Sequence, residues 1–409
     1  MTNIEQLIFD MCPGGVKTAA LGEIGEFYGG LSGKSKDDFV DGNEKYITYM
    51  NVFTHLAVDL DIANYVRINA GERQNTVKAG DIIFTGSSET PDECGISSVL
   101  TQDVDEPLYL NSFCFGLRLR DTSVLLPDFS KHLFRSGSLR KQIGKTASGV
   151  TRFNVSKEKM KKVVIPIPPL QVQREIVRIL DNFTELTAEL TAELTARKKQ
   201  YEYYRNELLT FGDDVLLVAL GEIAEFKYGY TDTAKNRGSA RFVRITDIGE
   251  NGKLLPTDCK YVDLTPESES YLLQKGDLLM ARTGATYGKT MLFGEDTPAV
   301  YASFLIRVRF PNDIVLPAYY WHFAQSGLYW YQANKLVSKA GQPQFNANVL
   351  KTVVMPIPSI KEQGRIINLL DRFDALVNDL TSGLPAEIEA RRKQYEYYRD
   401  KLLTFKEVS

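Results

Sequence analysis

Apolar residues recur at steps of three and four through two long segments of the chain. In the first segment they are Ile176, Ile179, Phe183, Leu186, Leu190, Leu194, Tyr201, Tyr204, Leu208 and Phe211. In the second they are Leu369, Phe373, Leu376, Leu380, Leu384, Ile388, Tyr395, Tyr398, Leu402 and Phe405. A narrow stripe kept over several heptads is typical of a coiled coil. Because one such helix cannot bury its stripe alone, we expect the two helices to pair with each other, antiparallel.

These two segments belong to a duplication that spans most of the chain. RKKQYEYYRNELLTF at 197–211 returns as RRKQYEYYRDKLLTF at 391–405, with three differences in fifteen residues. Internal repetition of this kind decides the architecture of a protein. Weaker matches precede each copy: LGEIGEF with LGEIAEF (21–27 and 220–226), VKAGDIIFTG with LQKGDLLMAR (77–86 and 273–282), LPDFSKHLFRSGS with LPAYYWHFAQSGL (126–138 and 316–328), and IPIPPLQVQ with MPIPSIKEQ (165–173 and 355–363).

The duplication predicts an α+β fold in which two globular α/β domains are separated by two long antiparallel coiled-coil helices. A pseudo-two-fold, nearly circular internal repeat would relate the two halves, because EQLIF at 5–9 resembles ELLTF at 207–211. Gly383 and Pro385 should kink or interrupt the second helix. The expected boundaries are 1–165 for the first domain, 166–211 for the first spacer helix, 212–355 for the second domain and 356–409 for the second spacer helix.

The first spacer contains TELTAELTAELTA at 184–196, three near-copies of a four-residue unit. These residues are good helix formers. Each further copy would lengthen a helix by about 6 Å. The segment is therefore either a stable helix in register or also a ruler that sets the distance between the two domains.

Composition excludes several classes of protein. No apolar run approaches the ~20 residues that a membrane-spanning helix needs, and the start of the chain lacks a secretory signal. The expected location is a reducing cytoplasm, with no membrane partner. With three histidines and no CxxC pair, a metal site is not expected. The cysteines, expected as free thiols, are Cys12, Cys94, Cys114 and Cys259.

Catalytic motifs are missing from the sequence. GATYGKT at 284–290 has three residues between its first glycine and the Gly-Lys-Thr, where a P-loop needs four. The residues after it favour a short strand rather than a helix that could hold a phosphate. GxSxG, HExxH and glycine-rich S-adenosylmethionine motifs are also missing. We therefore expect no cofactor in this chain and no catalysis by it.

Charge and loop composition favour recognition. The net charge is −3, yet residues 138–162 hold eight Lys or Arg against one Glu, which is 8 − 1 = +7. GKTASGVTRFN (144–154) and SKAGQPQFN (338–346) are basic loops that both end in Phe-Asn. Arginine can bind a guanine edge, and glutamine or asparagine an adenine edge; the alternative is an ordinary polar loop. The candidate DNA-contacting residues are Lys145, Thr151, Arg152, Arg241, Arg244, Arg282, Thr283, Tyr287, Lys289, Lys339, Gln342, Gln344 and Asn346.

Almost the whole chain resembles the DNA-specificity subunits of type I restriction-modification systems. The resemblance rests on the duplicated Pro-Ile-Pro-x4-Gln segment (166–173 and 356–363), the RKKQYEYYR and RRKQYEYYR helices, the TAEL tandem and GDLLMARTGATYG (276–288). It implies that residues 1–165 and 212–355 are target-recognition domains that read the two halves of a bipartite double-stranded DNA site. It also implies that two methyltransferase subunits and two motor-nuclease subunits bind the chain. Those partners would carry the S-adenosylmethionine, ATP and Mg²⁺.

One departure from the family pattern concerns the loop after the Gly-Asp strand of the first domain. The family has basic residues there, whereas this chain has Glu89, Asp92 and Glu93. DNA contact by that loop is therefore in doubt.

The two copies of the duplicated helix carry six tyrosines that we expect to be exposed. They exceed what one coiled-coil seam needs, and we expect the extra ones to face a partner. The candidate partner-binding residues are Tyr201, Tyr203, Tyr204, Arg205, Tyr395, Tyr397, Tyr398 and Arg399. Two rival functions stay open. An autonomous nuclease would cleave DNA by itself with a metal ion, and a coiled-coil scaffold would bind protein only, without DNA readout.

Overall fold

The chain forms two compact units, the first built from two separate stretches of sequence and the second from one continuous stretch. The computed structural model describes residues 6, 8, 10–338 and 343–406. The first unit combines residues 1–189 with 389–409, and the second is residues 190–388. We call residues 17–167 head 1 and residues 216–357 head 2. Two long helices, α7 (Leu170–Leu208) and α13 (Leu384–Leu402), contribute to both units, because the divisions at 189/190 and 388/389 fall inside them.

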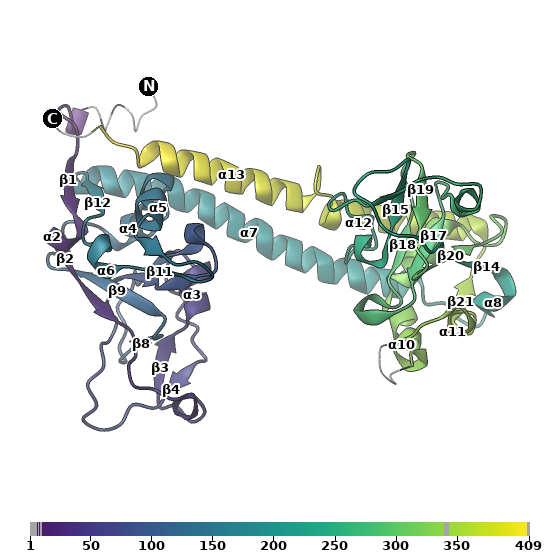
Figure 1. Cartoon of the computed structure of the whole chain (residues 1–409), viewed down its shortest axis with the longest axis horizontal. Helices are drawn as coiled ribbons and strands as arrows, with labels where there is room; N and C mark the ends of the chain where they lie inside the picture. Colours follow the sequence, from purple (N-terminus) through teal and green to yellow (C-terminus); the bar gives the residue numbers. More distant parts are fainter. Residues whose placement is uncertain (1–5, 7, 9, 339–342, 407–409) are drawn as a thin grey trace. The chain divides into compact units, whose positions relative to one another are not determined.

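Head 1 is built on a four-stranded antiparallel sheet in the order β2-β9-β5-β7. A smaller sheet, β4-β3-β8, lies at the end of the unit away from α4 and α5 (Figure 1). The strands are β1 Lys17–Ala20, β2 Gly25–Gly29, β3 Glu44–Ile47, β4 Tyr65–Val66, β5 Ile82–Thr85, β6 Ser87–Ser88, β7 Ser97–Val99, β8 Tyr109–Leu110, β9 Cys114–Leu119, β10 Ala147–Ser148, β11 Phe153–Val155 and β12 Val164–Ile167. The helices are α2 Leu21–Ile24, α3 Tyr49–Thr54, α4 Pro127–Leu133, α5 Gly137–Gly144 and α6 Lys157–Met160.

Head 2 repeats this topology. Its four-stranded sheet is β14-β20-β17-β18, its smaller sheet is β16-β15-β19, and β13 pairs with β21 as β1 pairs with β12. The strands are β13 Leu216–Ala219, β14 Glu225–Tyr228, β15 Ala240–Val243, β16 Tyr261–Val262, β17 Leu278–Ala281, β18 Thr290–Leu292, β19 Ala299–Tyr301, β20 Leu305–Arg309 and β21 Val354–Ile357. The helices are α8 Leu220–Ile223, α9 Pro317–Ala324, α10 Gly327–Leu336 and α11 Ala347–Leu350. The strand expected after GATYGKT is β18.

The duplicated Gly-Asp turn anchors each main sheet. Gly80 and Gly276 adopt φ of 86° and 94°, a conformation that favours glycine. The aspartate that follows is buried and pairs with an arginine across the sheet. Asp81 Oδ2 lies 2.6 Å from Arg118 Nη2 in head 1, and Asp277 Oδ1 lies 2.6 Å from Arg309 Nε in head 2. The sequence match between 77–86 and 273–282 thus holds residue by residue.

The glutamine of the duplicated Pro-Ile-Pro-x4-Gln segment has the same structural function in both units. Gln173 is fully buried; it accepts a hydrogen bond from the Leu126 amide (2.8 Å) and donates to the Val124 and Pro168 carbonyls (2.9 and 2.8 Å). Gln363 makes the same bonds in the second unit, with Leu316, Ile314 and Pro358. Each glutamine thereby satisfies three backbone groups where a strand, a loop and a helix meet.

Three long helices follow from the apolar stripe. Helix α7 is Leu170–Leu208 (39 residues), α12 is Ile360–Asn378 and α13 is Leu384–Leu402. The predicted interruption of the second helix is confirmed. Gly383 lies in the turn between α12 and α13. A Cβ there would lie 2.5 Å from the Ala375 carbonyl oxygen, so only glycine fits. Pro385 lies in the first turn of α13, where a missing N–H costs no hydrogen bond.

Each copy of the duplicated helix segment docks on one head through a buried histidine. In the first unit Tyr395 of α13 places its hydroxyl 2.9 Å from His132 Nδ1, and His132 Nε2 lies 2.7 Å from Asp181 Oδ1. In the second unit Tyr201 of α7 lies 3.4 Å from His322 Nδ1, and His322 Nε2 lies 2.8 Å from Asp371 Oδ1. The copy at 391–405 therefore belongs to head 1, and the copy at 197–211 to head 2.

The protonation states in the first unit fit this chain of bonds. Burial lowers the pKa of His132, and the hydrogen bond with Asp181 offsets this only in part. Burial also raises the pKa of Tyr395 to about 12. A neutral imidazole can then donate its Nε2–H to the Asp181 carboxylate while Nδ1 accepts from the Tyr395 hydroxyl.

A second contact joins each copy to the start of a short helix. Asp400 accepts a hydrogen bond from the Gly137 amide (2.9 Å), and Asn206 accepts one from the Gly327 amide (2.8 Å). An acceptor at a helix N-terminus satisfies one of its free N–H groups. A Cβ on Gly137 would lie 2.7 Å from Asp400 Oδ2, which explains the glycine there. One of the three differences between the copies, Asn206 for Asp400, thus keeps the same function.

Apolar burial completes the docking. Leu402 and Leu403 enter the core of head 1 beside Ile176 and Leu180 of α7. Leu209 enters the core of head 2 beside Ile366 of α12. Each unit is therefore held together by residues that are far apart in the sequence.

We predict that Gln173→Ala and Gln363→Ala each lower the free energy of unfolding by about 2–4 kcal/mol, because each leaves three buried backbone groups unpaired. Denaturant unfolding of the full chain measures this. Gln171→Ala, at an exposed position two residues before Gln173, is the control and should change stability little. Equal effects at 171 and 173 would contradict the assigned function of Gln173.

We predict that Tyr395→Phe costs about 1 kcal/mol of stability and Tyr201→Phe less, because the bond from Tyr395 to its histidine is shorter. Tyr397→Phe, with its side chain 63% exposed, is the control. Thermal unfolding of the three variants gives the order. A larger effect at Tyr397 than at Tyr395 would show that the histidine contact does not hold the helix.

Candidate nucleic-acid interface

In head 1 the candidate loop is 149–152, which joins β10 to β11. A Cβ on Gly149 would lie 2.0 Å from the Arg152 carbonyl oxygen, so the tight turn requires glycine. β11 pairs in turn with β6, with Asn154 opposite Ser87. This pairing brings Thr151 and Arg152 next to the loop that follows β5.

Thr151 and Arg152 line a pocket of about 460 Å³. The Arg152 guanidinium lies 5.5 Å from the ring centre of Phe113, and its Nε donates to Ser87 Oγ (3.2 Å). Exposed Met50 and Phe113 form the apolar part of the wall. The other lining residues are Tyr49, Phe53, Ser87, Ser88, Glu89 and Glu93. The pocket thus presents one guanidinium and two carboxylates beside an aromatic surface.

The acidic loop beside this pocket is held by an arginine from the basic cluster. Arg140 donates to the carbonyls of Asp92, Cys94 and Gly95. Burial lowers its pKa to about 10. Arg140, one of the eight basic residues of 138–162, therefore stabilises the interior of head 1. The sequence predicted that its charge would lie at the surface, and it does not. Lys145, at the C-terminal end of α5, is exposed and lies outside the pocket.

In head 2, Arg282 and Thr283 follow β17. The Arg282 guanidinium lies 5.3 Å from the ring centre of Phe304 and 5.4 Å from that of Tyr228, and its Nε donates to the Ser303 carbonyl (3.1 Å). Gln344 donates to Thr283 Oγ1 (3.0 Å). The structure thus brings Arg282, Thr283 and Gln344 together.

The other candidates of head 2 have different surroundings. Tyr287 donates to Asn334 Oδ1 (2.8 Å). Arg244 pairs with Asp247 (2.7 Å), and Arg241, 8% exposed, pairs with Glu295 (3.0 Å). These two arginines therefore hold head 2 together rather than joining the loop around Arg282. Lys339 and Gln342 lie outside the described residues.

The last candidate, Asn346, caps a helix. Its side-chain oxygen accepts from the Val349 amide (3.1 Å) at the start of α11. Ser156 does the same for α6, accepting from the Lys159 amide (3.3 Å). Asn346 therefore corresponds to Ser156 and serves the fold of head 2.

This equivalence corrects the sequence match of the two loops. The Phe-Asn endings of GKTASGVTRFN and SKAGQPQFN do not correspond. Gln344 lies opposite Thr283 as Asn154 lies opposite Ser87, so the match is shifted by two residues. Strand pairing decides the register, and a short shared dipeptide does not.

Phe113 and Phe304 lie beside the candidate arginines, although the predicted recognition loops do not include them. Their exposed fractions are 56% and 51%. They occupy the same position, because Cys114 pairs with Thr85 as Leu305 pairs with Ala281. The signal that would have found them is the shared Ser-Phe dipeptide before each strand, at 112–113 and 303–304.

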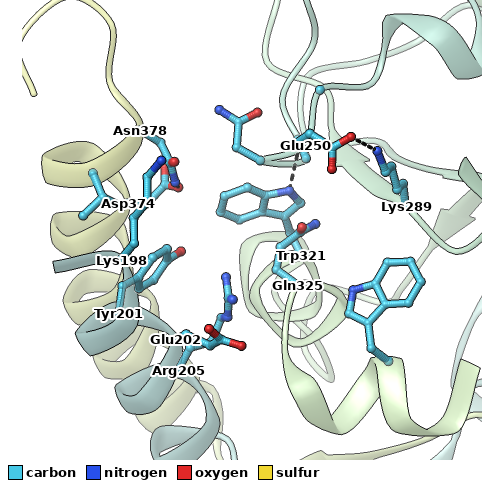
Figure 2. A pocket seen from close by; sticks show the side chains of 15 residues that line it. Lys198, Tyr201, Glu202, Arg205, Glu250, Lys289, Trp321, Gln325, Asp374 and Asn378 are labelled. Atoms are coloured by element: carbon cyan, nitrogen blue, oxygen red, sulfur yellow. Dashed lines mark hydrogen bonds and ion pairs between the residues drawn. The ribbon is translucent and has the colours of Figure 1, made fainter. Parts of the chain in front are cut away.

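Head 2 and the helices of its unit enclose a polar pocket of about 440 Å³ (Figure 2). Lys198, Tyr201, Glu202 and Arg205 of α7 face Trp321 and Gln325 of head 2 across it. Two ion pairs lie at its wall: Lys289 with Glu250 (2.5 Å), and Asp374 with Lys253 (2.5 Å). Lys289 therefore lines the helix–head junction and does not join Arg282.

The tyrosines of the duplicated helix divide into three kinds. Tyr201 is 5% exposed and Tyr395 is mostly buried, because both contact a histidine of a head. The expectation that all six tyrosines are exposed is therefore wrong for this pair. Tyr204 stacks on Phe373 and Tyr398 on Phe183, with ring centres 5.5 and 5.3 Å apart. Tyr203 and Tyr397 are 59% and 63% exposed.

The two arginines predicted to bind a partner contact tyrosines of their own helix. The Arg205 guanidinium lies 4.7 Å from the ring centre of Tyr201, and that of Arg399 lies 5.6 Å from Tyr395. Such cation–π contacts help to order the ring that binds the histidine.

Two further observations concern other classes of site. Within residues 10–338 and 343–406, no group of three His, Cys, Asp or Glu side chains is placed to hold a metal ion. Among the described helices, none is long and apolar enough to cross a membrane. Cys94 and Cys114 are buried free thiols, as expected, and Cys12 and Cys259 are also free.

Comparison with known proteins gives a consistent picture. The family model of the type I restriction modification DNA specificity domain matches residues 13–197 and 213–390. A putative type I restriction enzyme specificity subunit of Haemophilus influenzae is 34% identical over 267 residues, 63% of this chain and 68% of that protein. The type I restriction enzyme EcoR124I/EcoR124II specificity subunit of Escherichia coli is 37% identical over 274 residues, 61% of this chain and 65% of that protein.

Solved structures share the fold. A chain from work on complex assembly and conformational transition of the type I R-M system superposes with a TM-score of 0.63. It is 17% identical, and the match covers 95% of this chain and 97% of that one. The S subunit of a type I restriction-modification system from M. genitalium gives a TM-score of 0.50 at 14% identity, over 95% and 96% of the two chains.

The relatives are named as specificity subunits, the non-catalytic components of these systems. The family domain matches twice, at 13–197 and 213–390, and each match contains one of the two heads of the same topology. The chain therefore belongs to the family of type I restriction-modification DNA specificity subunits.

Proposed function

We propose that this chain reads a bipartite double-stranded DNA target with its two heads and gives an adenine methyltransferase its sequence specificity. The target-recognition domains would be 1–165 and 212–355, and the conserved spacers 166–211 and 356–409. The observation that supports this most is that two heads of one topology carry different residues at equivalent loop positions. Gly86 stands where head 2 has Arg282, and Asn154 where head 2 has Gln344. One scaffold with two different recognition loops suits two half-sites of different sequence.

The proposal assigns the spacing of the half-sites to the helices. The two spacers would pair as an antiparallel coiled coil around a pseudo-two-fold axis, and the TAEL repeats would set the gap. The contacts that support this are local to each unit: Phe183 stacks on Tyr398 in the first, and Tyr201 stacks on Phe373 in the second. A helix that is docked on a head at its end transmits any change of length to the head.

The proposal assigns catalysis to partners. Two methyltransferase subunits would bring S-adenosylmethionine, and two motor-nuclease subunits would bring ATP and Mg²⁺ for restriction in the cytoplasm. Discrimination by base contacts is worth about 1–3 kcal/mol for each bidentate pair. Phosphate contacts by lysines would add salt-dependent affinity, so this acidic chain can bind DNA with a modest number of contacts.

We expect a methyl-adenine motif in two parts with a fixed gap in cells that express the chain with its cognate methyltransferase. Sequencing the methylome with and without this gene tests it. The motif should disappear with the gene. A stable complex with an active methyltransferase but no gene-dependent motif would favour the protein-binding scaffold instead.

We predict that Tyr203 and Tyr397 bind the methyltransferase, because they are the most exposed tyrosines of the duplicated helix. Tyr203→Ala and Tyr397→Ala should each remove one of two bound methyltransferase copies, and the double variant both. Native mass spectrometry of the purified complexes counts the copies. Tyr331→Ala, 65% exposed on head 2, is the matched control. Two copies bound to the folded double variant would refute this assignment.

A further inference from the structure

Both heads expose a phenylalanine at the same point of the main sheet. Phe113 and Phe304 precede β9 and β20, and their carbonyls accept hydrogen bonds from Gly86 and Arg282 (2.7 and 3.0 Å). The sequences around the two residues diverge in the neighbouring loops. Leaving about half of a phenylalanine in water forgoes apolar burial. Two such residues at one position of a repeated scaffold point to a use outside the core.

An arginine lies over each ring, but it comes from a different part of each head. In head 1 it is Arg152, from the loop between β10 and β11, at 5.5 Å from the ring centre. In head 2 it is Arg282, from the end of β17, at 5.3 Å. The same geometry is therefore reached from two places in the sequence. Because the two arginines occupy different positions in the repeat, inheritance of one ancestral contact does not explain the similarity. A functional requirement common to both heads does explain it.

The guanidinium groups are held in the same way. Arg152 Nε donates to Ser87 Oγ (3.2 Å), and Arg282 Nε donates to the Ser303 carbonyl (3.1 Å). Among the residues that the structure describes, neither Nη group of either arginine has a hydrogen-bond partner. Each arginine thus has its guanidinium over an aromatic ring, an anchored Nε and, among the described residues, Nη donors without a partner.

That pair of donors suits the guanine edge. Guanine presents O6 and N7 side by side in the major groove, and an arginine can bind both. Holding the guanidinium plane before binding reduces the side-chain entropy lost on contact. The phenylalanine ring and the Nε hydrogen bond restrict the guanidinium in both heads, and in head 2 the Tyr228 ring also lies 5.4 Å from it.

We propose that Phe113 and Phe304 are positioning residues for DNA recognition. Each orients one arginine, Arg152 in head 1 and Arg282 in head 2, so that it binds a guanine, and each half-site therefore contains one guanine. This inference rests on the proposed function. It adds the residue pair that acts in each head and the base that each pair selects.

The test uses the full chain expressed with its cognate methyltransferase, and the methylome is the readout. Phe113→Ala should relax the requirement for one guanine in one half-site by about tenfold and leave the other half-site unchanged. Phe304→Ala should do the same for the opposite half-site. Arg152→Lys and Arg282→Lys, which keep the charge and lose the fork, should relax the same two positions.

Rescue separates positioning from simple packing. Phe113→Tyr keeps the aromatic plane and should retain the guanine, whereas Phe113→Leu keeps apolar bulk and should behave like alanine. Tyr65→Ala in head 1 and Tyr331→Ala in head 2, both exposed tyrosines outside these contacts, are the controls and should leave the motif intact. Thermal unfolding should show that all variants fold.

Three outcomes would overturn the inference. A wild-type motif in which one or both half-sites lack a guanine would do so. A Phe113→Leu variant that keeps full selectivity for guanine would also do so. An alanine variant that changes both half-sites equally would also do so, because it would indicate a general loss of structure. If the wild-type chain directs no motif at all, the proposed function itself fails.

Discussion

The bond from a helix tyrosine to a buried histidine of a head is the contact on which the arrangement of each unit depends. Tyr395 meets His132, and Tyr201 meets His322, at the same place of the two units. The aspartate on the far side of each imidazole comes from the helix that directly follows that head, Asp181 on α7 and Asp371 on α12. One histidine thus joins a head to two helices. The docking also explains why the chain contains the fifteen-residue segment twice, since each head needs its own copy.

A consequence is that the first unit is discontinuous in sequence, because it combines residues 1–189 with 389–409, whereas the second unit is the continuous stretch 190–388. Head 1 takes the copy at the end of the chain, and head 2 takes the copy that precedes it. Leu402 and Leu403 are buried with Ile176 and Leu180, so removal of the last helix would open the core of the first unit. Such long-range closure makes the stability of head 1 depend on Leu402 and Leu403, which are far from it in the sequence.

The heads divide into a repeated scaffold and variable loops. The buried Asp81–Arg118 and Asp277–Arg309 pairs, the Gln173 and Gln363 networks and the strand order are the same in both. The loops differ in charge, since Glu89 and Glu93 lie near Arg152 in head 1, whereas the uncharged Thr283 and Gln344 lie near Arg282 in head 2. A rigid scaffold with exposed variable loops allows specificity to change without loss of the fold.

Much of this could be predicted from the sequence, because repeats and helical periodicity depend on residues that are near each other along the chain. The stripe predicted α7 and α13, Gly383 predicted the break between α12 and α13, and the Gly-Asp match was correct in register. Other features are decided by contacts between distant residues. The sequence could not show that Tyr201 is buried, that Arg140 and Arg241 serve the interior, or that Asn346 corresponds to Ser156. Burial, ion pairing and strand register are set only when the chain closes on itself. The sequence by itself determined the duplicated architecture and its family, whereas the tertiary structure decided which arginines lie free on a phenylalanine, because that depends on loops folding back over the sheet from different positions in each head.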